Sequence, residues 1–328
     1  MLRLFADAKY DFIGARRRAY AITAVFLVVG LAALILNGVN YSVEFTGGTL
    51  VQVHTQAPID VGVVRNELAA HGINGAEIQS FGSPTEYVIR ARTAKEGTDA
   101  DNTQETATAI SEGLDQVLGV GAYTISRTEA VGPKVGGELR QKAFIAIFLS
   151  FLAVLLYLAF RFEWRFGLAA VIATAHDLMT TIGFVALLNL EISLVVVAAI
   201  LSMVGYSLND TIIIFDRVRE NLRKIRGEDL SQILNRSINE TLPRSVLTHG
   251  TTLATLGALA IFGGEVIRPF ALVMFFGVLT GTFSSIYIAS PILRVIEARW
   301  PGEGVKALSA PIKGRGSASA KRKVPSAT

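Results

Sequence analysis

Two carboxylates lie inside long apolar stretches of the sequence, where a charge is costly. Asp210 lies within residues 192–215, and Asp177 follows His176 in the middle of residues 166–188. A stretch of that length spans a bilayer, and insertion scales put a carboxylate at its centre at roughly 2.5–3.5 kcal/mol unfavourable. Ionisable groups at such depth usually face the inside of a helix bundle, and proton or ion relays are the leading reason for them. Each of these residues is therefore a candidate for a proton relay, and the alternative is a buried hydrogen-bonding anchor.

Other polar side chains recur at helical spacing and share faces with these carboxylates. Hydroxyl groups can hold a chain of water molecules, and a carboxylate can bind and release a proton, so the pattern predicts a polar, hydrated path within the bundle. The members are Ser202, Tyr206 and Asn209 in the stretch 192–215, Thr174 and Thr181 in the stretch 166–188, and Thr248, Thr251, Thr252 and Thr255 in the stretch 245–262.

Arg244, which immediately precedes the stretch 245–262, carries a charge that can act on Asp210. If the two side chains pair, the arginine holds the carboxylate ionised, and if they separate, the carboxylate takes up a proton. One pair of residues would thus give two states. The alternative is that Arg244 is an ordinary basic residue at the cytoplasmic end of a membrane helix.

The composition of the 328-residue chain fits a polytopic α-helical membrane protein with a modest soluble part, because 51% of its residues are hydrophobic and only 18% are charged. The first apolar segment lacks an A-x-A-like cleavage site and is longer than a typical signal-peptide core, so we expect a retained anchor. Six segments are predicted to span the membrane, namely residues 19–36, 143–160, 166–188, 192–215, 245–262 and 269–290.

Basic residues set the expected orientation of these helices. Arg16, Arg17 and Arg18 precede the first segment, and seven Lys/Arg fall between residues 217 and 244. The positive-inside rule therefore predicts that both termini are cytoplasmic and that the long loop lies outside the cytoplasm. The predicted division is a cytoplasmic N-terminus (1–18), a first helix (19–36), an exported domain (37–142), the other five helices (143–298) and a basic, disordered tail (299–328).

Several kinds of chemistry are not indicated by the sequence. The chain has no cysteine, and His54 and His71 lack metal-ligand spacing, so neither a disulfide framework nor a metal or cofactor site is expected. The net charge of +4 mostly reflects basic residues beside the membrane, so nucleic-acid binding is not predicted. There is no G-x-x-x-x-G-K-[ST] phosphate loop, so driven work must come from a partner or an ion gradient. We do not expect an enzyme.

The exported domain is predicted to be an α+β domain with the order β-α-β-β-α-β, as in a ferredoxin-like sheet with two helices on one face. Residues 42–54 alternate in hydrophobicity around Gly47–Gly48 and predict the first strand. Asp60 is a plausible N-cap for the helix that follows. Because nothing catalytic stands out in this domain, we expect it to pack against the bundle or to bind a partner.

A glycine- and proline-containing segment joins this domain to the second membrane helix. Gly132 and Pro133 mark a turn, and Gly136 and Gly137 permit unusual backbone angles. The segment is either a plain linker or a hinge about which the domain tilts over the membrane.

A second pattern of small residues lies in the last apolar segment, where Gly277, Gly281, Ser285 and Ala289 recur at every fourth position. This spacing favours close helix packing. Six helices with one exported domain, and no internal repeat, look like one half of a two-fold transporter. The other half would then be a separate chain.

Eight short motifs, in a fixed order on this six-helix plan, carry a resemblance that covers about residues 10–298. By these motifs the chain resembles the SecF family, the smaller membrane subunits of bacterial SecDF protein-export factors, within the resistance-nodulation-division superfamily. One departure is Glu44, where the family commonly has Asp. The motifs are EFTGGT (44–49), VGPKVGGEL (131–139), AHD (175–177), GYSLNDT (205–211), DRVREN (216–221), TLPRS (241–245), TTL (251–253) and SSIY (284–287).

The resemblance implies a complex with SecD, often with YajC, beside the SecYEG channel of the bacterial inner membrane, with residues 37–142 in the periplasm. In that family, proton flow helps to draw an emerging polypeptide into the periplasm after the ATPase SecA has pushed it. The family's proton-path carboxylate and arginine correspond to Asp210 and Arg244 of this sequence. A further carboxylate of the path belongs to SecD.

Three other functions compete with this interpretation. The first is one half of a proton-driven exporter of small molecules or lipids from the same superfamily, which usually carries both halves in one chain. The second is an intramembrane serine protease built on Ser207 and His249. The third is a passive scaffold without a proton path.

Overall fold

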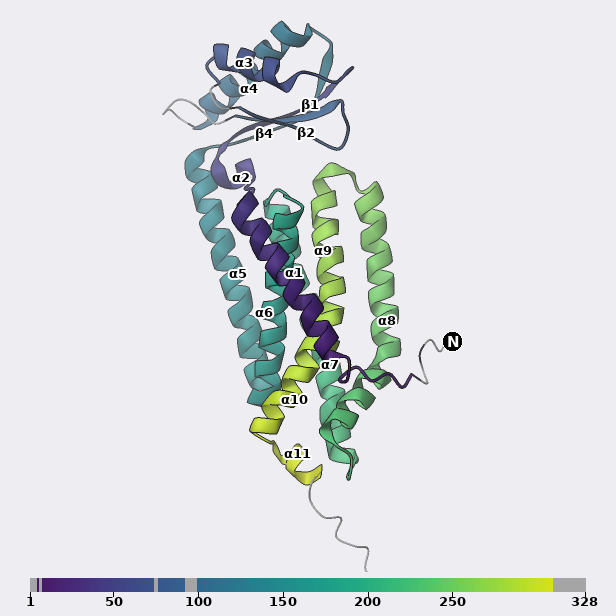
Figure 1. Cartoon of the computed structure of the whole chain (residues 1–328). Coiled ribbons are helices and arrows are strands. Elements are labelled where there is room, and N and C mark those ends of the chain that lie inside the picture. The colour runs from purple at the N-terminus through teal and green to yellow at the C-terminus, as the bar shows by residue number, and fades with distance from the viewer. Residues whose placement is uncertain (1–4, 6–7, 74–75, 92–98, 309–328) are drawn as a thin grey trace, which may run out of the picture.

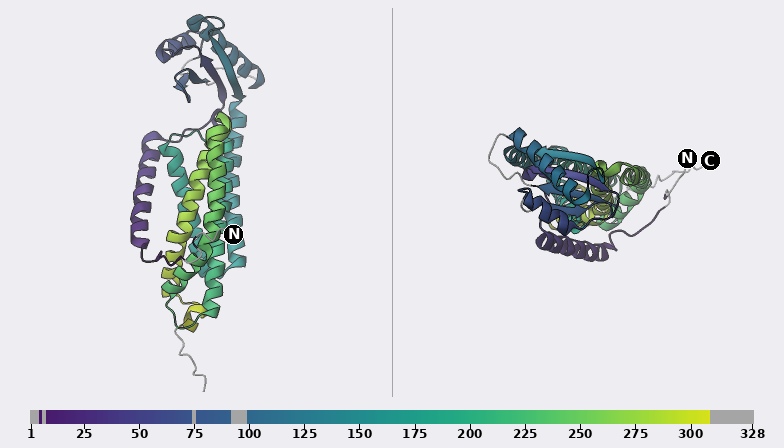
Figure 2. Two further views of the ribbon diagram at one scale, coloured as in Figure 1. Left: turned by 90° about the vertical axis from the view of Figure 1, so that its right-hand side faces the viewer. Right: turned by 90° about the horizontal axis from the view of Figure 1, so that it is seen from above.

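A computed structural model of the chain describes residues 5, 8–73, 76–91 and 99–308. It shows an elongated helix bundle with a small α/β domain at one end (Figure 1). We call the opposite end of the bundle, where α10 and α11 lie, the basal end. Both views in Figure 2 show the small domain stacked on the bundle and α1 along its outer edge. Residues 309–328, most of the predicted basic tail, lie outside the described residues.

Six helices of the described chain are long and apolar enough to cross a membrane, so the chain is a multi-pass membrane protein, as the sequence predicts. The last of the six continues from α9 through a π-helical turn, η1, into α10. The helices are α1 (Arg16–Asn37), α5 (Pro133–Arg161), α6 (Trp164–Leu187), α7 (Leu194–Lys224), α8 (Leu230–Phe262) and α9 (Gly264–Ser284) with η1 (Ser285–Ala289) and α10 (Ser290–Arg299).

The helices α7 and α8 extend past their apolar stretches at the basal end. α8 begins at Leu230 behind a capping box formed by Asp229 and Gln232, so Pro243 lies inside this helix and does not open it. Polar contacts join the two extensions, since Arg217 Nε lies 2.6 Å from a carboxylate oxygen of Glu240. The predicted spans 192–215 and 245–262 thus cover only the apolar parts of these two helices, because that prediction follows hydropathy alone.

The small domain has the predicted order of strands and helices. Its four strands form one sheet in the order β2-β3-β1-β4, and every neighbouring pair is antiparallel. Side chains from the sheet and from both helices form a core of their own, which includes Val53, Leu68, Ile89 and Leu114. The elements are β1 (Gly48–Thr55), α3 (Val61–Ala70), β2 (Glu77–Ser80), β3 (Glu86–Ala91), α4 (Asp99–Leu118) and β4 (Tyr123–Val131).

The start of the predicted first strand is wrong in one respect. Residues Val43–Thr46 form a short helical turn, α2, and the strand begins only at Gly48. Ser42 caps this turn by accepting a hydrogen bond from the backbone N–H of Glu44. Gly47 follows with φ 73°, a left-handed conformation that favours glycine.

The junction between the small domain and the bundle is short and well packed. β4 ends at Val131, Gly132 caps α5, and Pro133 is the first residue of that helix. Gly136 and Gly137 are therefore helical, and the expectation of unusual backbone angles there is wrong. A Cβ atom on Gly136 would lie 2.8 Å from the backbone nitrogen of Gly47, so close approach of α5 to α2 explains this glycine.

Three further contacts hold the small domain against the loop before α7. Arg90 on β3 forms a 2.6 Å ion pair with Glu191. A carboxylate oxygen of Glu44 accepts a hydrogen bond from the backbone N–H of Leu194, at the first turn of α7. A backbone hydrogen bond also joins Ser42 to Ile192. The residue before α2, α2 itself and β3 are therefore all held against the segment that leads into α7.

The small-residue stripe of the last helix packs closely, as the sequence predicts. A Cβ atom on Gly277 would lie 2.1 Å from Cγ of Met203, and one on Gly281 would lie 2.8 Å from Cβ of Ser207. The helix that approaches is α7 of the same chain. Ser285 and Ala289 of the stripe are buried in the π-helical turn.

Candidate functional site

Asp177 lies at the centre of a closed polar cluster between α6, α7 and α9. Its side chain is fully buried, with 0% exposure. One carboxylate oxygen, Oδ2, accepts hydrogen bonds from the hydroxyl groups of Ser207 and Ser284, the latter at 2.6 Å. The other, Oδ1, lies 2.9 Å from Nδ1 of His176. Both oxygens are thus occupied, and three helices meet at one carboxylate.

His176 adds a second feature to this cluster. Its other ring nitrogen, Nε2, is buried and has no hydrogen-bond partner within the described part of the chain. The ring lines a cavity of about 190 Å³ with Phe26 of α1 and Phe283 of α9. The cluster of Asp177 therefore borders the side of the bundle that α1 covers.

Asp210 lies one helical turn beyond Ser207 on α7, but it faces α8. The residue is 3% exposed, and Oδ1 accepts a 2.6 Å hydrogen bond from the hydroxyl group of Ser245. Nε2 of His249 lies 4.0 Å from the same oxygen. The second oxygen, Oδ2, is buried and has no hydrogen-bond partner within the described residues. This carboxylate is therefore only half satisfied.

Arg244 is not paired with Asp210 in this structure. Its side chain is exposed, although it directly precedes Ser245, which donates to that carboxylate. The arginine and the serine thus occupy adjacent positions of α8 with different environments. The structure thus has the arginine apart from the carboxylate, which is one of the two arrangements that the sequence suggests.

Most of the predicted polar path lies on the surface of α7 and α8 and not inside the bundle of this chain. Tyr206 is partly buried, and its hydroxyl group lies 2.8 Å from that of Thr252. Ser202 donates to the backbone oxygen of Ala198, within its own helix. The exposed members are Ser202, Asn209, Thr248, Thr251 and Thr255. The reason is that α8 packs through its other face, so this side of the two helices stays open.

Several residues of the two clusters could not be chosen from the sequence. Ser284 and Ser207 reach Asp177 only because α7 and α9 pack closely, and serines in apolar helices give no signal of their own. Ser285 meets Thr211 at 2.7 Å within the π-helical turn, a distortion that often occurs at functional sites. His249 could be chosen from the sequence, because it is an ionisable residue within an apolar helix.

The protease alternative finds no support in this arrangement. Ser207 donates its hydroxyl hydrogen to Asp177, whereas His249 lies against Asp210 and Tyr206, with ring centroids 5.5 Å apart for Tyr206 and His249. The described residues show no hydrogen bond between Ser207 and His249. In the same part of the chain, no group of three or more His, Cys, Asp or Glu is placed to hold a metal ion.

Comparison with known proteins agrees with the fold and with the positions of these motifs. Residues 113–299 match the family described as protein export membrane protein SecD/SecF, C-terminal. This segment includes α5 to α10 and therefore both carboxylate clusters. Residues 32–59 match the SecD/SecF GG motif, and this segment contains α2 and all of β1.

Curated relatives match over nearly the whole chain. A protein translocase subunit SecF of Gemmatimonas aurantiaca is 55% identical over 304 residues, which cover 92% of this chain and 91% of that protein. A protein translocase subunit SecF of Pseudomonas aeruginosa is 40% identical and covers 86% of this chain and 90% of that protein.

Solved structures show the same fold within a longer chain. The crystal structure of SecDF, a translocon-associated membrane protein from Thermus thermophilus, has a TM-score of 0.78 and 36% identity, and the match covers 90% of this chain. SecDF in a super-membrane-facing form has a TM-score of 0.63 and 35% identity. This chain spans 39% of each SecDF chain. It therefore belongs to the SecD/SecF family of protein-export membrane proteins and, within that family, to the SecF members.

Proposed function

We propose that the chain is the SecF subunit of a proton-gradient-driven translocation factor that, with SecD, promotes late steps of Sec-dependent polypeptide export. The curated relatives are named as translocase subunits, and the structural relatives are SecDF chains of which this chain spans 39%. The part of each SecDF chain that this chain does not match is long enough for a SecD partner. SecYEG, YajC and the translocating polypeptide are the further partners of this proposal.

The observation that carries the proposal is the incomplete hydrogen bonding of Asp210. A permanently ionised carboxylate without a partner on one oxygen is costly in a buried site, whereas a protonated one is not. Ser245 donates to Oδ1, and Oδ2 is buried without a partner in the described chain. A carboxyl group so placed can hold a proton and release it when a cation or water reaches the open oxygen.

Arg244 is the cation that we assign to this second state. It precedes Ser245 by one residue and is exposed on α8, so a small rotation or shift of α8 would bring its charge toward Asp210. An approaching guanidinium favours the ionised carboxylate, and its withdrawal favours protonation. His249, with Nε2 at 4.0 Å from Asp210, is a second group through which a proton could pass.

The membrane topology is part of the proposal. Both termini lie in the cytoplasm of a bacterial inner membrane, and residues 37–142 form a periplasmic domain. The sheet order β2-β3-β1-β4 with two helices supports the ferredoxin-like assignment of that domain. The basal end of the bundle is then cytoplasmic, which agrees with the basic residues of α7 and α8 beyond the apolar stretches.

The experiment that tests the proposal compares Asp210→Asn with the parent in reconstituted vesicles, with and without an imposed proton gradient. We expect the variant to insert and to copurify with SecD but to lose gradient-dependent export, because the amide keeps the shape and cannot ionise. Asp210→Glu is the matched control and should keep part of the response. Arg244→Met should fail like Asp210→Asn. An Asn variant that still responds to the gradient like the parent would contradict the proposal.

Movement of the small domain about Gly132 and the start of α5 is the mechanical part of the proposal. The contacts that would have to open include the ion pair between Arg90 and Glu191. The chain has no native cysteine, so cysteines at these two positions can be joined by a short bis-maleimide without side reactions. We expect the crosslink to block export and leave SecD binding intact. Full export by the crosslinked protein would exclude the hinge.

A further inference from the structure

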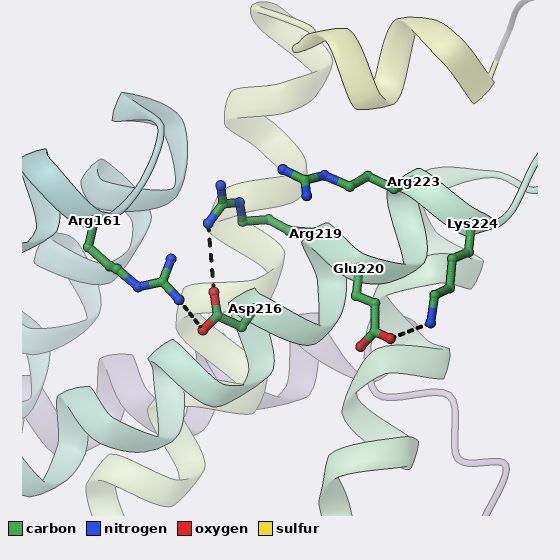
Figure 3. A pocket seen from close by; sticks show the side chains of 6 residues that line it. All are labelled: Arg161, Asp216, Arg219, Glu220, Arg223 and Lys224. Carbon is green, nitrogen blue, oxygen red and sulfur yellow. Dashed lines mark hydrogen bonds and ion pairs between the residues drawn. The ribbon is translucent and has the colours of Figure 1, made fainter.

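A hollow at the basal end of the bundle is lined entirely by charged side chains. It lies between the end of α5 and the extension of α7 and has a volume of about 520 Å³. Four of its six lining residues are cations, so the hollow carries an excess of two positive charges. The lining residues are Arg161, Asp216, Arg219, Glu220, Arg223 and Lys224 (Figure 3).

The two carboxylates do not neutralise the arginines evenly. Asp216 is shared by Arg161 at 2.6 Å and Arg219 at 3.7 Å. Glu220 pairs with Lys224, and Figure 3 shows this pair turned away from the three arginines. Arg223 forms no hydrogen bond or ion pair with any described residue. Two guanidinium groups therefore share one carboxylate, and the third, that of Arg223, is free to bind an anion.

An aromatic ring fixes two of these arginines in place. The guanidinium carbon of Arg161 lies 4.9 Å from the ring centroid of Phe162, and that of Arg219 lies 5.6 Å from it. Phe162 is buried and packs against Phe166 and Phe215. Stacking on a ring holds a guanidinium plane at low entropic cost, so the donors are organised before any anion arrives.

Two tryptophans place the hollow at the depth of lipid headgroups. Trp164 opens α6 and Trp300 follows α10, and their exposed rings meet edge to face at 5.9 Å. Indole rings concentrate at membrane–water interfaces. The apolar part of α5 also ends here, because the 90% exposed Phe160 is followed directly by Arg161.

From these observations we propose that Arg161, Arg219 and Arg223 bind the phosphate group of an anionic phospholipid. Planar guanidinium groups bind phosphate oxygens through paired N–H donors, and basic pockets beside membrane helices bind anionic headgroups. An acyl chain of such a lipid would lie along the exposed apolar surface of α5. The site is separate from both buried carboxylates and does not depend on proton transport by Asp210.

Comparison with a neighbouring hollow on α7 gives the reason for assigning the phosphate to the first hollow. It has a volume of about 280 Å³ and also contains Arg219 and Arg223. However, it is lined by Glu163, Glu297 and Glu303 as well, and Arg165 pairs with the first two of them. The three cations there, which include Arg226, face three carboxylates, so that hollow has no excess charge, whereas the first hollow has an excess of two positive charges.

The test uses native mass spectrometry of the purified full chain in neutral detergent, titrated with phosphatidylglycerol or phosphatidylcholine. We expect one phosphatidylglycerol per chain, held at least about tenfold more tightly than phosphatidylcholine, since one charge-assisted hydrogen bond contributes about that factor. Arg219→Gln with Arg223→Gln should abolish this preference. Arg17→Gln with Arg18→Gln removes equal charge near the same end of the bundle and should leave it unchanged. Arg223→Gln alone, which breaks no hydrogen bond or ion pair of the described residues, should weaken it and covers the case of a misfolded double variant.

Three outcomes would overturn the proposal. Equal losses in the two double variants would show a general charge effect and no site. Equal binding of the two lipids would show that the site does not distinguish an anionic headgroup from a zwitterionic one. Binding of inorganic phosphate at the arginines without any preference for phosphatidylglycerol would identify a site for free phosphate.

Discussion

The two buried carboxylates of the bundle differ in how completely their oxygens are hydrogen-bonded. Asp177 accepts from two serines and lies beside His176, so both of its oxygens have partners. Asp210 accepts from Ser245 alone, and its second oxygen has no partner in the described chain. The same residue type in similar apolar helices thus has two different environments. A carboxylate whose two oxygens both have hydrogen-bond partners suits an anchor. One with an oxygen that lacks a partner suits a group that changes its protonation.

The difference follows from how the neighbouring helices pack. On the Asp177 side, Gly277 and Gly281 let α9 approach α7 closely, so serines from two helices reach one carboxylate. On the Asp210 side, α8 leaves Thr248 and Thr251 exposed. Close packing therefore gives both oxygens of Asp177 a partner, and a looser face leaves one oxygen of Asp210 without a partner among the described residues. The relay role predicted for Asp177 and His176 stays a prediction, and this geometry favours an anchor.

Gly281→Leu should give the largest effect, because it breaks the packed side. Even a Cβ atom at this position would lie 2.8 Å from Cβ of Ser207, so leucine must push α9 away from α7. Overpacking of this kind costs typically 1–3 kcal/mol, and contact with backbone places this site at about 3 kcal/mol or more. Gly250→Leu on α8 is the control, since nothing lies within 4 Å of its Cβ position. Thermal unfolding in detergent measures the stability of both variants. Equal stability of the two would show that the chain is not packed more tightly around Gly281 than around Gly250.

Replacement of each carboxylate by alanine should give the next largest effect and should distinguish the two sites directly. Asp177→Ala removes the acceptor of the Ser207 hydroxyl and the partner of His176, while Ser284 can still donate to the backbone oxygen of Gly281. Each unsatisfied group costs about 1–3 kcal/mol, so we expect a loss of about 3 kcal/mol. Asp210→Ala affects only Ser245, for which about 1 kcal/mol is expected. Chemical unfolding of both variants under one condition is the measurement. A larger loss for Asp210→Ala would reverse the assignment of anchor and responsive group.

Asp229→Ala should give the smallest effect, since it acts on the far end of the helix that carries Ser245. Hydrogen bonds from Ser231, first from its side chain, lower the pKa of Asp229 below its ordinary value. This contribution to stability is therefore present above the pKa of the unfolded state, about 3.9, and is lost as the pH falls through the lower folded value. We expect a loss of about 1 kcal/mol at pH 7 and no difference from the parent at strongly acidic pH. A pH-independent loss would show that the N-cap charge is not responsible.

Much of the architecture could be predicted from hydropathy and spacing. The six spans follow from the lengths of the apolar stretches, and the order of elements in the small domain follows from alternation and turn residues. The stripe of Gly277 and Gly281 also predicted a close helix contact, which the structure shows against α7. These signals are local, because each one depends on residues a few positions apart.

The partners of the two carboxylates could not be predicted in the same way. Ser284 lies 107 positions from Asp177, and Ser245 lies 35 positions from Asp210, so only the packing of helices brings them together. The extension of α8 to Leu230 was missed because charged helical residues resemble a loop in hydropathy. The exposure of Thr248 and Thr251 was missed because periodicity does not say which face of a helix is covered.

We propose that Asp210 exchanges a proton while Asp177 does not. Infrared difference spectroscopy of the reconstituted complex, recorded as the pH is cycled, detects the carbonyl stretching band of a protonated carboxylic acid. We expect this band to be present in the parent, to persist in Asp177→Asn and to disappear in Asp210→Asn. A band that survives in Asp210→Asn and disappears in Asp177→Asn would contradict this assignment and would place the exchanging proton on Asp177.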